Sequence, residues 1–178
     1  MSMPASFQIH GAGVAGLSVA SALVARGAQV SLYDPHGVPD THCCSWWAGG
    51  MLAPFCEGEA AEEPVVRLGQ KAASWWQEQG VDVVQKGSLV VALARDKSEL
   101  TRVARRTRQH QIVDEDGIAV LEPDLVGRVR QGLFFETEAH LSPRDALKTL
   151  TENLISAGVT ISSNAPVSEP TAQLIDCR

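Results

Sequence analysis

A glycine-rich stretch at residues 11–16, with the sequence GAGVAG, constrains the fold of this chain more than any other feature. A short apolar segment, 7–10, precedes it. An alanine-rich segment, 17–26, follows with the composition of a helix that packs closely on a sheet. Gly27 then interrupts the chain, and residues 28–33 alternate as a second strand. The sequence therefore predicts a strand–helix–strand unit that begins with a glycine turn.

Glycines in this context are typical of a site for the pyrophosphate of a dinucleotide. Gly11 permits a tight turn, Gly13 lets backbone amides approach a phosphate, and Gly16 allows close helix–strand packing. The helix dipole and the first-turn amides then bind the anion without a lysine. Asp34 ends the second strand, at a spacing that suits a carboxylate accepting hydrogen bonds from ribose hydroxyls. A glycine turn in an ordinary α/β protein is the alternative, and the context favours dinucleotide binding.

Composition narrows the class of protein further. The chain has 178 residues, 44% of them apolar, and a net charge of −6, which describes one or two globular, mildly acidic domains. It has no basic, aromatic-interleaved stretch for nucleic acid and no apolar run near the roughly 20 residues that span a membrane. Glycines interrupt the apolar N-terminus, and no basic segment precedes it, which argues against a secretory signal. The cysteines match neither a zinc site nor a CxxC pair, so we expect reduced thiols and a cytoplasmic location: Cys43, Cys44, Cys56 and Cys177.

The middle of the chain mixes loops, helices and strands. A proline- and glycine-containing loop is expected at 35–41, and the adjacent Trp46 and Trp47 should point to opposite faces, one into the core and one toward a cavity. Helical spacing predicts one helix from Pro64 to Gly80. Further predictions are an antiparallel strand pair at 81–84 and 88–93, a helix capped by Asp96 with a solvated arginine face, a turn and short helix at 121–125, and a strand at 133–135.

The last part of the chain returns to alternating helix and strand. Ser142 and Pro143 suit the N-cap and first position of a helix that ends at Gly158, with Leu147, Leu150 and Leu154 buried. Residues 159–162 are predicted as a strand, and 174–177 as a buried parallel strand. Such a strand normally leads into a covering helix, so we expect a further half of polypeptide beyond Arg178.

Several motifs together resemble one family. GAGVAGLS at 11–18, LYDP at 32–35 and SWWAGGMLAP at 45–54 are similar to the glycine oxidase branch of the D-amino-acid-oxidase-like flavoenzymes, which includes the thiamine-biosynthesis glycine oxidases. Later motifs agree with this resemblance: GSLVVA at 87–92, LEPDL at 121–125, EAHLSPR at 138–144 and DCR at 176–178. The likeness covers nearly all of this chain but only about the first half of a family member's length.

The resemblance implies an α/β fold and FAD as the cofactor. We expect a Rossmann-like, three-layer FAD-binding domain with a parallel sheet, formed by 1–63 and 141–178 and incomplete here. Residues 64–140 would form part of an α+β substrate domain with antiparallel strands. The implied cofactor-binding residues are Gly11, Gly13, Val14, Ala15 and Gly16 at the pyrophosphate, Asp34 at the ribose, Val167 at the adenine through its backbone, and Ser45, Ala48, Gly49, Gly50 and Met51 in the segment that passes the isoalloxazine ring.

The implied activity is oxidative deamination of glycine or another small primary or secondary amino acid. In this family a hydride moves from the substrate α-carbon to flavin N5, the imine hydrolyses, and oxygen accepts the electrons to give hydrogen peroxide. The substrate-binding arginine and the aromatic residues that face the flavin lie in the other half. We therefore assign no catalytic and no metal-binding residue to this chain, and interpret His140 as structural. Met51, Trp46 and Trp47 are candidates for the wall of the site.

The sequence departs from the family pattern at two places and leaves two other functions to consider. His10 stands where the family has a small or aliphatic residue, and the loop between Val167 and Leu174 is short. A non-catalytic dinucleotide-binding or interaction module is the alternative function. An NAD-dependent reductase is disfavoured, because SWWAGGM has no evident role beside a nicotinamide.

Overall fold

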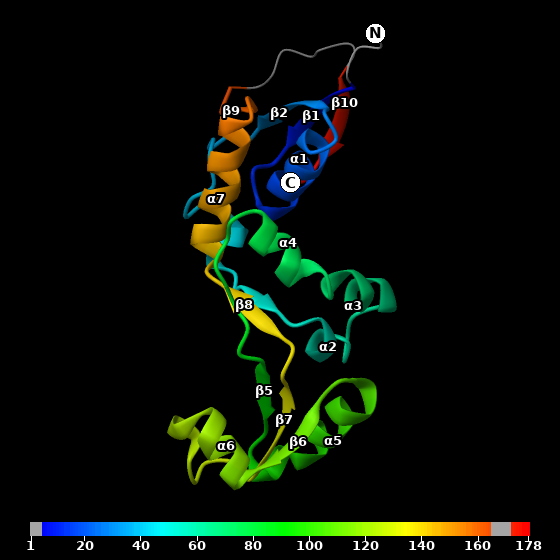
Figure 1. The fold of residues 1–178 in the computed structure, drawn as a ribbon, viewed down its shortest axis with the longest axis vertical. Coiled ribbons are helices and arrows are strands. Elements are labelled where there is room, and N and C mark those ends of the chain that lie inside the picture. Colours follow the sequence, from blue (N-terminus) through cyan, green and yellow to red (C-terminus); the bar gives the residue numbers. More distant parts are fainter. Residues whose placement is uncertain (1–4, 165–171) are drawn as a thin grey trace. The chain divides into compact units, whose positions relative to one another are not determined.

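The computed structural model describes residues 5–164 and 172–178, which form two compact units (Figure 1). The first unit contains the residues up to Gly50, the short segment Glu78–Asp82, and the residues from Ser142 onward. The second contains Met51–Gln77 and Val83–Leu141. The chain therefore leaves the first unit twice and returns to it each time.

The first unit is built on a parallel sheet in the order β10–β1–β2–β9. In its register, Ile9 lies opposite Leu32 on one side and Ile175 on the other. This confirms the predicted strand–helix–strand unit and the parallel pairing of the last strand. The bounds are β1 (Ser6–His10), β2 (Gln29–Tyr33), β9 (Thr160–Ser162) and β10 (Gln173–Asp176).

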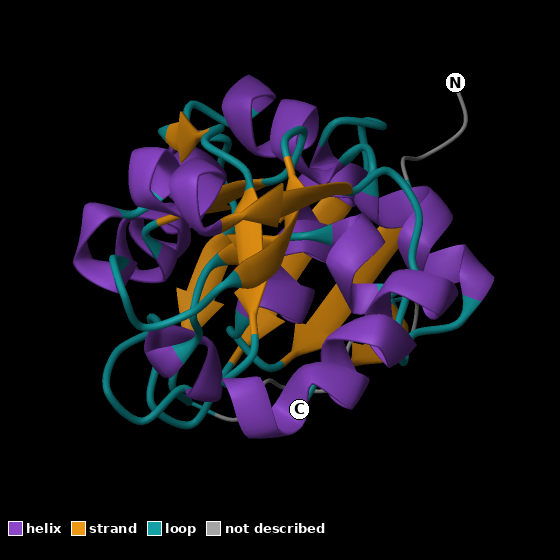
Figure 2. Cartoon of the chain, turned by 90° about the horizontal axis from the view of Figure 1, so that it is seen from below, coloured by secondary structure: helices purple, strands orange, loops and turns teal. Residues whose placement is uncertain are grey.

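Helices α1 (Val14–Val24) and α7 (Pro143–Ser156) pack against each other in this unit. Figure 2 distinguishes the helices of the chain from its strands by colour. Pro143 occupies the first turn of α7, and the Ser142 hydroxyl accepts the N–H of Asp145 at 3.5 Å, as the sequence predicts. The apolar stripe of α7 is also confirmed, because Leu147, Leu150 and Leu154 are buried. A short 3₁₀ turn, η1 (Cys44–Trp47), contacts α7.

The prediction that the last strand is buried is wrong for the described residues. β10 is an edge strand, and the Leu174 side chain is 61% exposed. Its apolar residues predict burial on both faces, but Gln173, Leu174 and Asp176 of β10 are exposed. Leu174 lies on the same face as Gln8 and His10 of β1, because it is opposite Gln8 and Asp176 is opposite His10.

The second unit contains two antiparallel sheets, β3–β8–β4 and β5–β7–β6. This confirms the predicted fold class, a mixed α/β chain with a parallel part and an antiparallel part. The strands are β3 (Met51–Leu52), β4 (Val83–Val84), β5 (Ser88–Val91), β6 (Gln111–Asp114), β7 (Gln131–Phe135) and β8 (Ala139–Leu141). The helices are α2 (Pro54–Glu57), α3 (Glu63–Gly69), α4 (Ala72–Glu78), η2 (Ala94–Asp96), α5 (Lys97–Arg106), α6 (Glu115–Leu121) and η3 (Pro123–Leu125).

The predicted hairpin between β4 and β5 does not form. β4 pairs with β8, and β5 pairs with β7, so both run along the chain that returns through residues 131–141. Gly87 lies between them with φ of +79°, and its N–H donates to the carbonyl of Glu138 at 2.9 Å. At Gly87 the chain therefore passes from pairing with β8 to pairing with β7, and it does not turn back to pair β4 with β5.

The predicted helix from Pro64 to Gly80 is two helices, α3 and α4. Gly69 ends α3, and a Cβ at this position would lie 3.0 Å from the Cβ of Pro54 in α2. The close approach of α2 and α3 therefore coincides with the break. Helical spacing of apolar residues continues across Gln70 and Lys71, which is why the pattern predicts a single helix.

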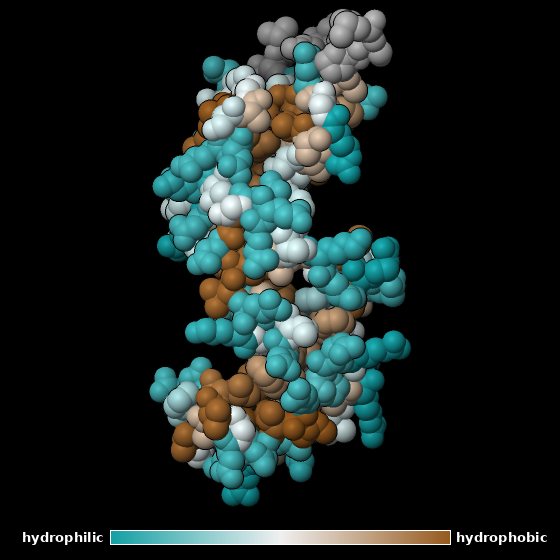
Figure 3. Space-filling model, in the orientation of Figure 1, coloured by the Kyte–Doolittle hydropathy of each residue, from teal (hydrophilic) through white to brown (hydrophobic). Residues whose placement is uncertain are grey.

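Leu100, Leu133 and Phe135 form the core of the second unit. Around α6 and β6, its surface is apolar in places (Figure 3), with Ile112, Val120 and Val126 each at least 60% exposed. In the described part of the chain, no helix has the length and apolar character needed to cross a membrane.

Candidate functional site

The glycine turn connects the carboxyl end of β1 to the start of α1 in the first unit. Gly11 has φ of +104°, a conformation that favours glycine. A Cβ on Gly16 would clash with the carbonyl oxygen of Gly11. Both glycines are therefore required by the turn itself, whatever it binds.

Gly13 is different, because its backbone would accept a side chain. It is the N-cap of α1 with φ of −70°, and a Cβ there would make an ordinary contact, 3.4 Å from Ser45 Oγ. No side chain caps the helix at this residue. First-turn amides have no partner within a helix, and of these Val14 donates its N–H to Ser45 Oγ at 3.1 Å. A bare backbone at a helix N-terminus fits the pyrophosphate of a dinucleotide.

Asp34 follows β2 at the same edge of the sheet as the glycine turn. Its Oδ2 accepts the N–H of Ala12 at 3.0 Å, and its Oδ1 accepts the N–H of His36 at 3.0 Å. The side chain is 16% exposed. Each carboxylate oxygen can accept a further hydrogen bond, so the acid both braces the turn and can still bind a ribose hydroxyl.

Two histidines that the sequence analysis did not single out lie beside Asp34. The rings of His36 and His42 are 4.5 Å apart between centroids, and His42 Nε2 is 3.9 Å from Asp34 Oδ1. The Asp-Pro dipeptide at 34–35 could have indicated a turn that brings the His36 amide to the carboxylate. The position of His42 carries no comparable sequence signal.

The segment after the turn places both tryptophans beside one arginine. The Arg144 guanidinium carbon lies 5.5 Å from the ring centroid of Trp46 and 5.3 Å from that of Trp47. Trp47 is 64% exposed, and its indole N–H donates to the carbonyl of Thr41 at 2.9 Å. The expectation that one tryptophan enters the core is therefore wrong, because cation–π contact with α7 holds both near the surface.

The structure thus brings together the predicted residues of the turn, Asp34 and Ser45. Ala48 and Gly49 are exposed, and Gly50 has φ of +71°. Met51 begins the second unit and is 57% exposed. Val167 lies outside the described residues.

The end of β10 also approaches the glycine turn. A Cβ on Gly11 would lie 2.7 Å from the carbonyl oxygen of Cys177, and the Cys177 N–H donates to the backbone carbonyl of His10 at 2.7 Å. The Arg178 guanidinium makes two hydrogen bonds to Asp176, at 2.9 and 2.8 Å. These bonds hold the pKa of the Asp176 carboxyl well below its usual range.

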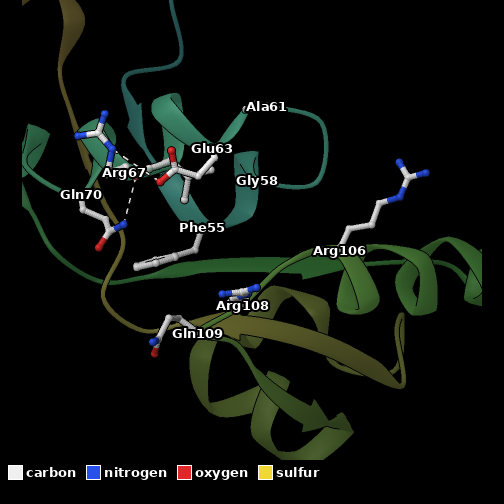
Figure 4. A pocket seen from close by; sticks show the side chains of 10 residues that line it. Phe55, Gly58, Ala61, Glu63, Arg67, Gln70, Arg106, Arg108 and Gln109 are labelled. Carbon is white, nitrogen blue, oxygen red and sulfur yellow. Dashed lines mark hydrogen bonds and ion pairs between the residues drawn. The ribbon is translucent and has the colours of Figure 1, made fainter.

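A separate cavity of about 510 Å³ lies in the second unit, between α2–α3 and the end of α5 (Figure 4). Phe55 and Arg108 are among its lining residues. Two other arginines of the lining are paired with acids: Arg67 lies 3.6 Å from Glu63, and Arg106 lies 3.1 Å from Glu59. These ion pairs compensate much of the positive charge, in keeping with the solvated arginine face predicted for α5.

Comparisons with known proteins agree on one family. A family model described as FAD dependent oxidoreductase matches residues 9–175. A protein of Rhizobium etli, named as a thiamine biosynthesis oxidoreductase ThiO, is 51% identical over 147 residues, which are 82% of this chain and 45% of that protein.

Solved structures show the same fold at lower identity. Glycine oxidase from Bacillus cereus is 22% identical with a TM-score of 0.70, over 88% of this chain and 46% of the other. Iminodiacetate oxidase from Chelativorans is 20% identical with a TM-score of 0.73, over 96% and 54%. The chain spans about half the length of these relatives.

Proposed function

The chain belongs to the family of FAD-dependent oxidoreductases, and on that premise we propose that it is the N-terminal half of an amino-acid oxidase of the glycine oxidase type. The reaction is oxidative deamination of glycine or another small primary or secondary amino acid, with imine and hydrogen peroxide as products. Motifs across the whole chain support this proposal, as does the ThiO relative, which is 51% identical. The FAD site is the part of the enzyme that this chain supplies.

The observation that carries the proposal is the N-terminus of α1, whose N-cap Gly13 has no side chain, beside Asp34. In the proposed site the backbone of Gly11, Gly13, Val14, Ala15 and Gly16 holds the pyrophosphate, and Asp34 holds the ribose. The Ser45 hydroxyl, which already accepts the Val14 N–H at 3.1 Å, orders the start of the helix. Val167 at the adenine, and Ala48, Gly49, Gly50 and Met51 at the isoalloxazine ring, complete the set on the ground of the motif match.

When bound, FAD supplies the acceptor for the hydride of the substrate α-carbon. The contribution of this chain is to bind and orient the cofactor. Glycines before Met51 leave room for backbone N–H groups near the ring and for a small substrate. The groups that bind the substrate carboxylate belong to the other half, so no residue of this chain is proposed as catalytic.

The domain division follows the same logic. We assign 1–63 and 141–178 to the FAD-binding domain and 64–140 to part of the substrate domain. These boundaries differ from those of the compact units, because 51–63 and 141 lie in the second unit and 78–82 lies in the first. A C-terminal half completes both, whether it is a separate chain or a continuation of this one.

Co-expression with the part of the Rhizobium etli relative that this chain does not match tests the proposal. We expect a yellow complex that releases hydrogen peroxide with glycine or another small amino acid. A colourless complex that binds ADP or NAD, with no oxidase activity on a panel of amino acids, would instead support a non-catalytic module.

A further inference from the structure

Glu138 holds the start of α2 from a position 82 residues away in the sequence. Its side chain is 1% exposed, in the short connection between β7 and β8 of the second unit. Oε1 accepts the N–H of Phe55 at 2.9 Å and the N–H of Cys56 at 2.7 Å. These are first-turn amides of α2, and the preceding Ala53 offers no side-chain cap. A carboxylate from another element therefore satisfies amides that the helix leaves open.

The same short stretch also holds the chain immediately before α2. β3 pairs with β8 in a register that places Met51 opposite His140 and Leu52 opposite Ala139. Residues 138–140 thus bind residues 51–56 at two places, once through a strand ladder and once through Glu138. Met51 is the last residue of the segment proposed to pass the isoalloxazine ring.

Burial of this carboxyl has a cost that packing alone does not explain. A buried charge is unfavourable unless hydrogen bonds compensate it, and within the described residues Glu138 Oε2 is buried without a partner. An apolar side chain would fill the space without that cost. An apolar side chain could not accept the N–H groups of Phe55 and Cys56. We therefore look for the function of Glu138 in the position that it gives to residues 51–56.

We propose that Glu138 is a positioning residue for the flavin site, because its carboxylate fixes the start of α2 just after Met51, while the β3–β8 ladder holds Met51 itself against His140. This inference rests on the proposed function, since it assigns the consequence to bound FAD. Glu138 itself touches neither cofactor nor substrate in this proposal. Its effect passes through the backbone of residues 51–56.

Cys56 provides a local reporter that needs no cofactor. Burial raises the pKa of its thiol to about 11, and the negative charge of Glu138 adds to the effect. Because the thiolate is the reactive form, Cys56 should alkylate slowly while α2 stays in place. Opening of the Glu138 contact exposes the thiol and removes the charge, and both changes speed alkylation.

The experiment compares Glu138→Ala, Glu138→Gln and the exposed control Glu136→Ala, each co-expressed with the other half. Cys56 alkylation by N-ethylmaleimide is followed on its peptide by mass spectrometry, and the bound flavin by visible circular dichroism. We expect Glu138→Ala to accelerate alkylation about tenfold or more, since hydrogen bonds to a charged group are lost, and to change the flavin spectrum. Glu138→Gln keeps a hydrogen-bond acceptor, so its flavin spectrum should stay close to that of the wild type. Glu136→Ala should match the wild type in both alkylation rate and flavin spectrum.

The outcomes separate the possible failures. Unchanged alkylation in both Glu138 variants would overturn the contact itself. Faster alkylation with a wild-type flavin spectrum would reduce Glu138 to a structural role. If Glu138→Ala does not fold, a Glu138→Gln protein with normal alkylation and an altered spectrum would also contradict the proposal, because the acceptor is retained. Absence of flavin from the wild type would refute the proposed function, while the alkylation rates would still test the contact.

Discussion

Asp34 makes more contacts than its predicted one. Its carboxylate oxygens accept backbone N–H groups from Ala12 and His36, both at 3.0 Å. The first of these lies within the glycine turn, so the acid links the ends of two adjacent strands before any ligand arrives. Its removal should therefore loosen the turn and weaken ribose binding together.

Substitution Asp34→Ala should raise the dissociation constant for FAD about tenfold or more, because charge-assisted hydrogen bonds are each worth about 1.5–3 kcal/mol. Isothermal titration of FAD into the flavin-free complex of this chain with the co-expressed half measures this. Asp40→Ala is the control, because Asp40 is exposed and its carboxylate accepts only the neighbouring Thr41 amide among the contacts seen here. Equal affinities for the two variants would show that Asp34 is not a cofactor residue.

Cys56 predicts a dependence of stability on alkaline pH. Its thiol pKa is raised from 9.0 to about 11 in the folded protein, so the folded state holds the proton more tightly than the unfolded state. The stability linked to this group is complete below pH 9 and is lost as the pH rises from about 9 through about 11. Denaturant unfolding across this range should show a shallower alkaline decline for Cys56→Ser than for the wild type. Parallel declines would contradict the assignment.

Single residues were predictable where a local pattern fixes their role. Gly11, Gly16 and Asp34 follow from spacing along one strand–helix–strand unit, and the structure places them together. Arg144 and Glu138 were not predictable, because each meets its partner across a long stretch of sequence. Chemistry that depends on such distant pairs leaves no periodic signal. His42 is close to Asp34 in the sequence, but it lies in an irregular loop with no pattern that would indicate the contact.

In the glycine turn, one glycine is required by the fold and another is not. Gly16 must lack a side chain because of the Gly11 carbonyl, whereas Gly13 has ordinary backbone angles and room for a Cβ. The structure itself therefore gives no reason for glycine at position 13. Close approach of the proposed cofactor to the helix N-terminus would supply that reason.

The free energy of unfolding of Gly13→Ala should lie within about 0.5 kcal/mol of that of the wild type. Its affinity for FAD should fall about tenfold or more, since the added methyl group occupies the proposed phosphate position. Gly16→Ala should instead lower the free energy of unfolding by about 1–3 kcal/mol or more, because the clash is with backbone. Chemical denaturation and FAD titration of both variants measure the two effects separately. A Gly13→Ala protein with normal FAD affinity would argue against the site.

The contact of Arg144 in α7 with the tryptophans of η1 predicts a loss of stability when the arginine is removed. Arg144→Ala removes cation–π contacts to Trp46 and Trp47 and should lower the free energy of unfolding by about 1 kcal/mol. Quenching of tryptophan emission by acrylamide should also increase. Lys148→Ala, on the same helix, breaks only an exposed pair with Glu152 at 3.9 Å and should cost about 0.5 kcal/mol or less.

Elements with their own apolar period were predicted well, among them α7 and the parallel strands. Pairing between elements was not. The antiparallel partners of β4 and β5 lie about 50 residues further along the chain, and a glycine between two strands favours a hairpin on local grounds alone. The strand β6, the helix α6 and the two-residue strand β3 were not predicted from the sequence.

The molecule as a whole exposes apolar surface at both units. Leu174 is 61% exposed on the edge strand of the first unit, and Val120 is 83% exposed on the second. Exposed apolar patches of this kind mark surfaces that associate. We expect the chain alone to aggregate or bind a hydrophobic dye, and light scattering should fall on co-expression with the proposed C-terminal half. A monomeric chain with cooperative unfolding and no dye binding would contradict that expectation.

The proposed function depends on FAD binding by the glycine turn and Asp34. Identification of the nucleotide that co-purifies with the complex of the two halves tests this, for the wild type and for Gly13→Ala. We expect stoichiometric FAD in the wild type, shown by flavin absorbance and by the mass of the released cofactor, and little or none in the variant. Recovery of NAD, or equal FAD content in both proteins, would contradict it.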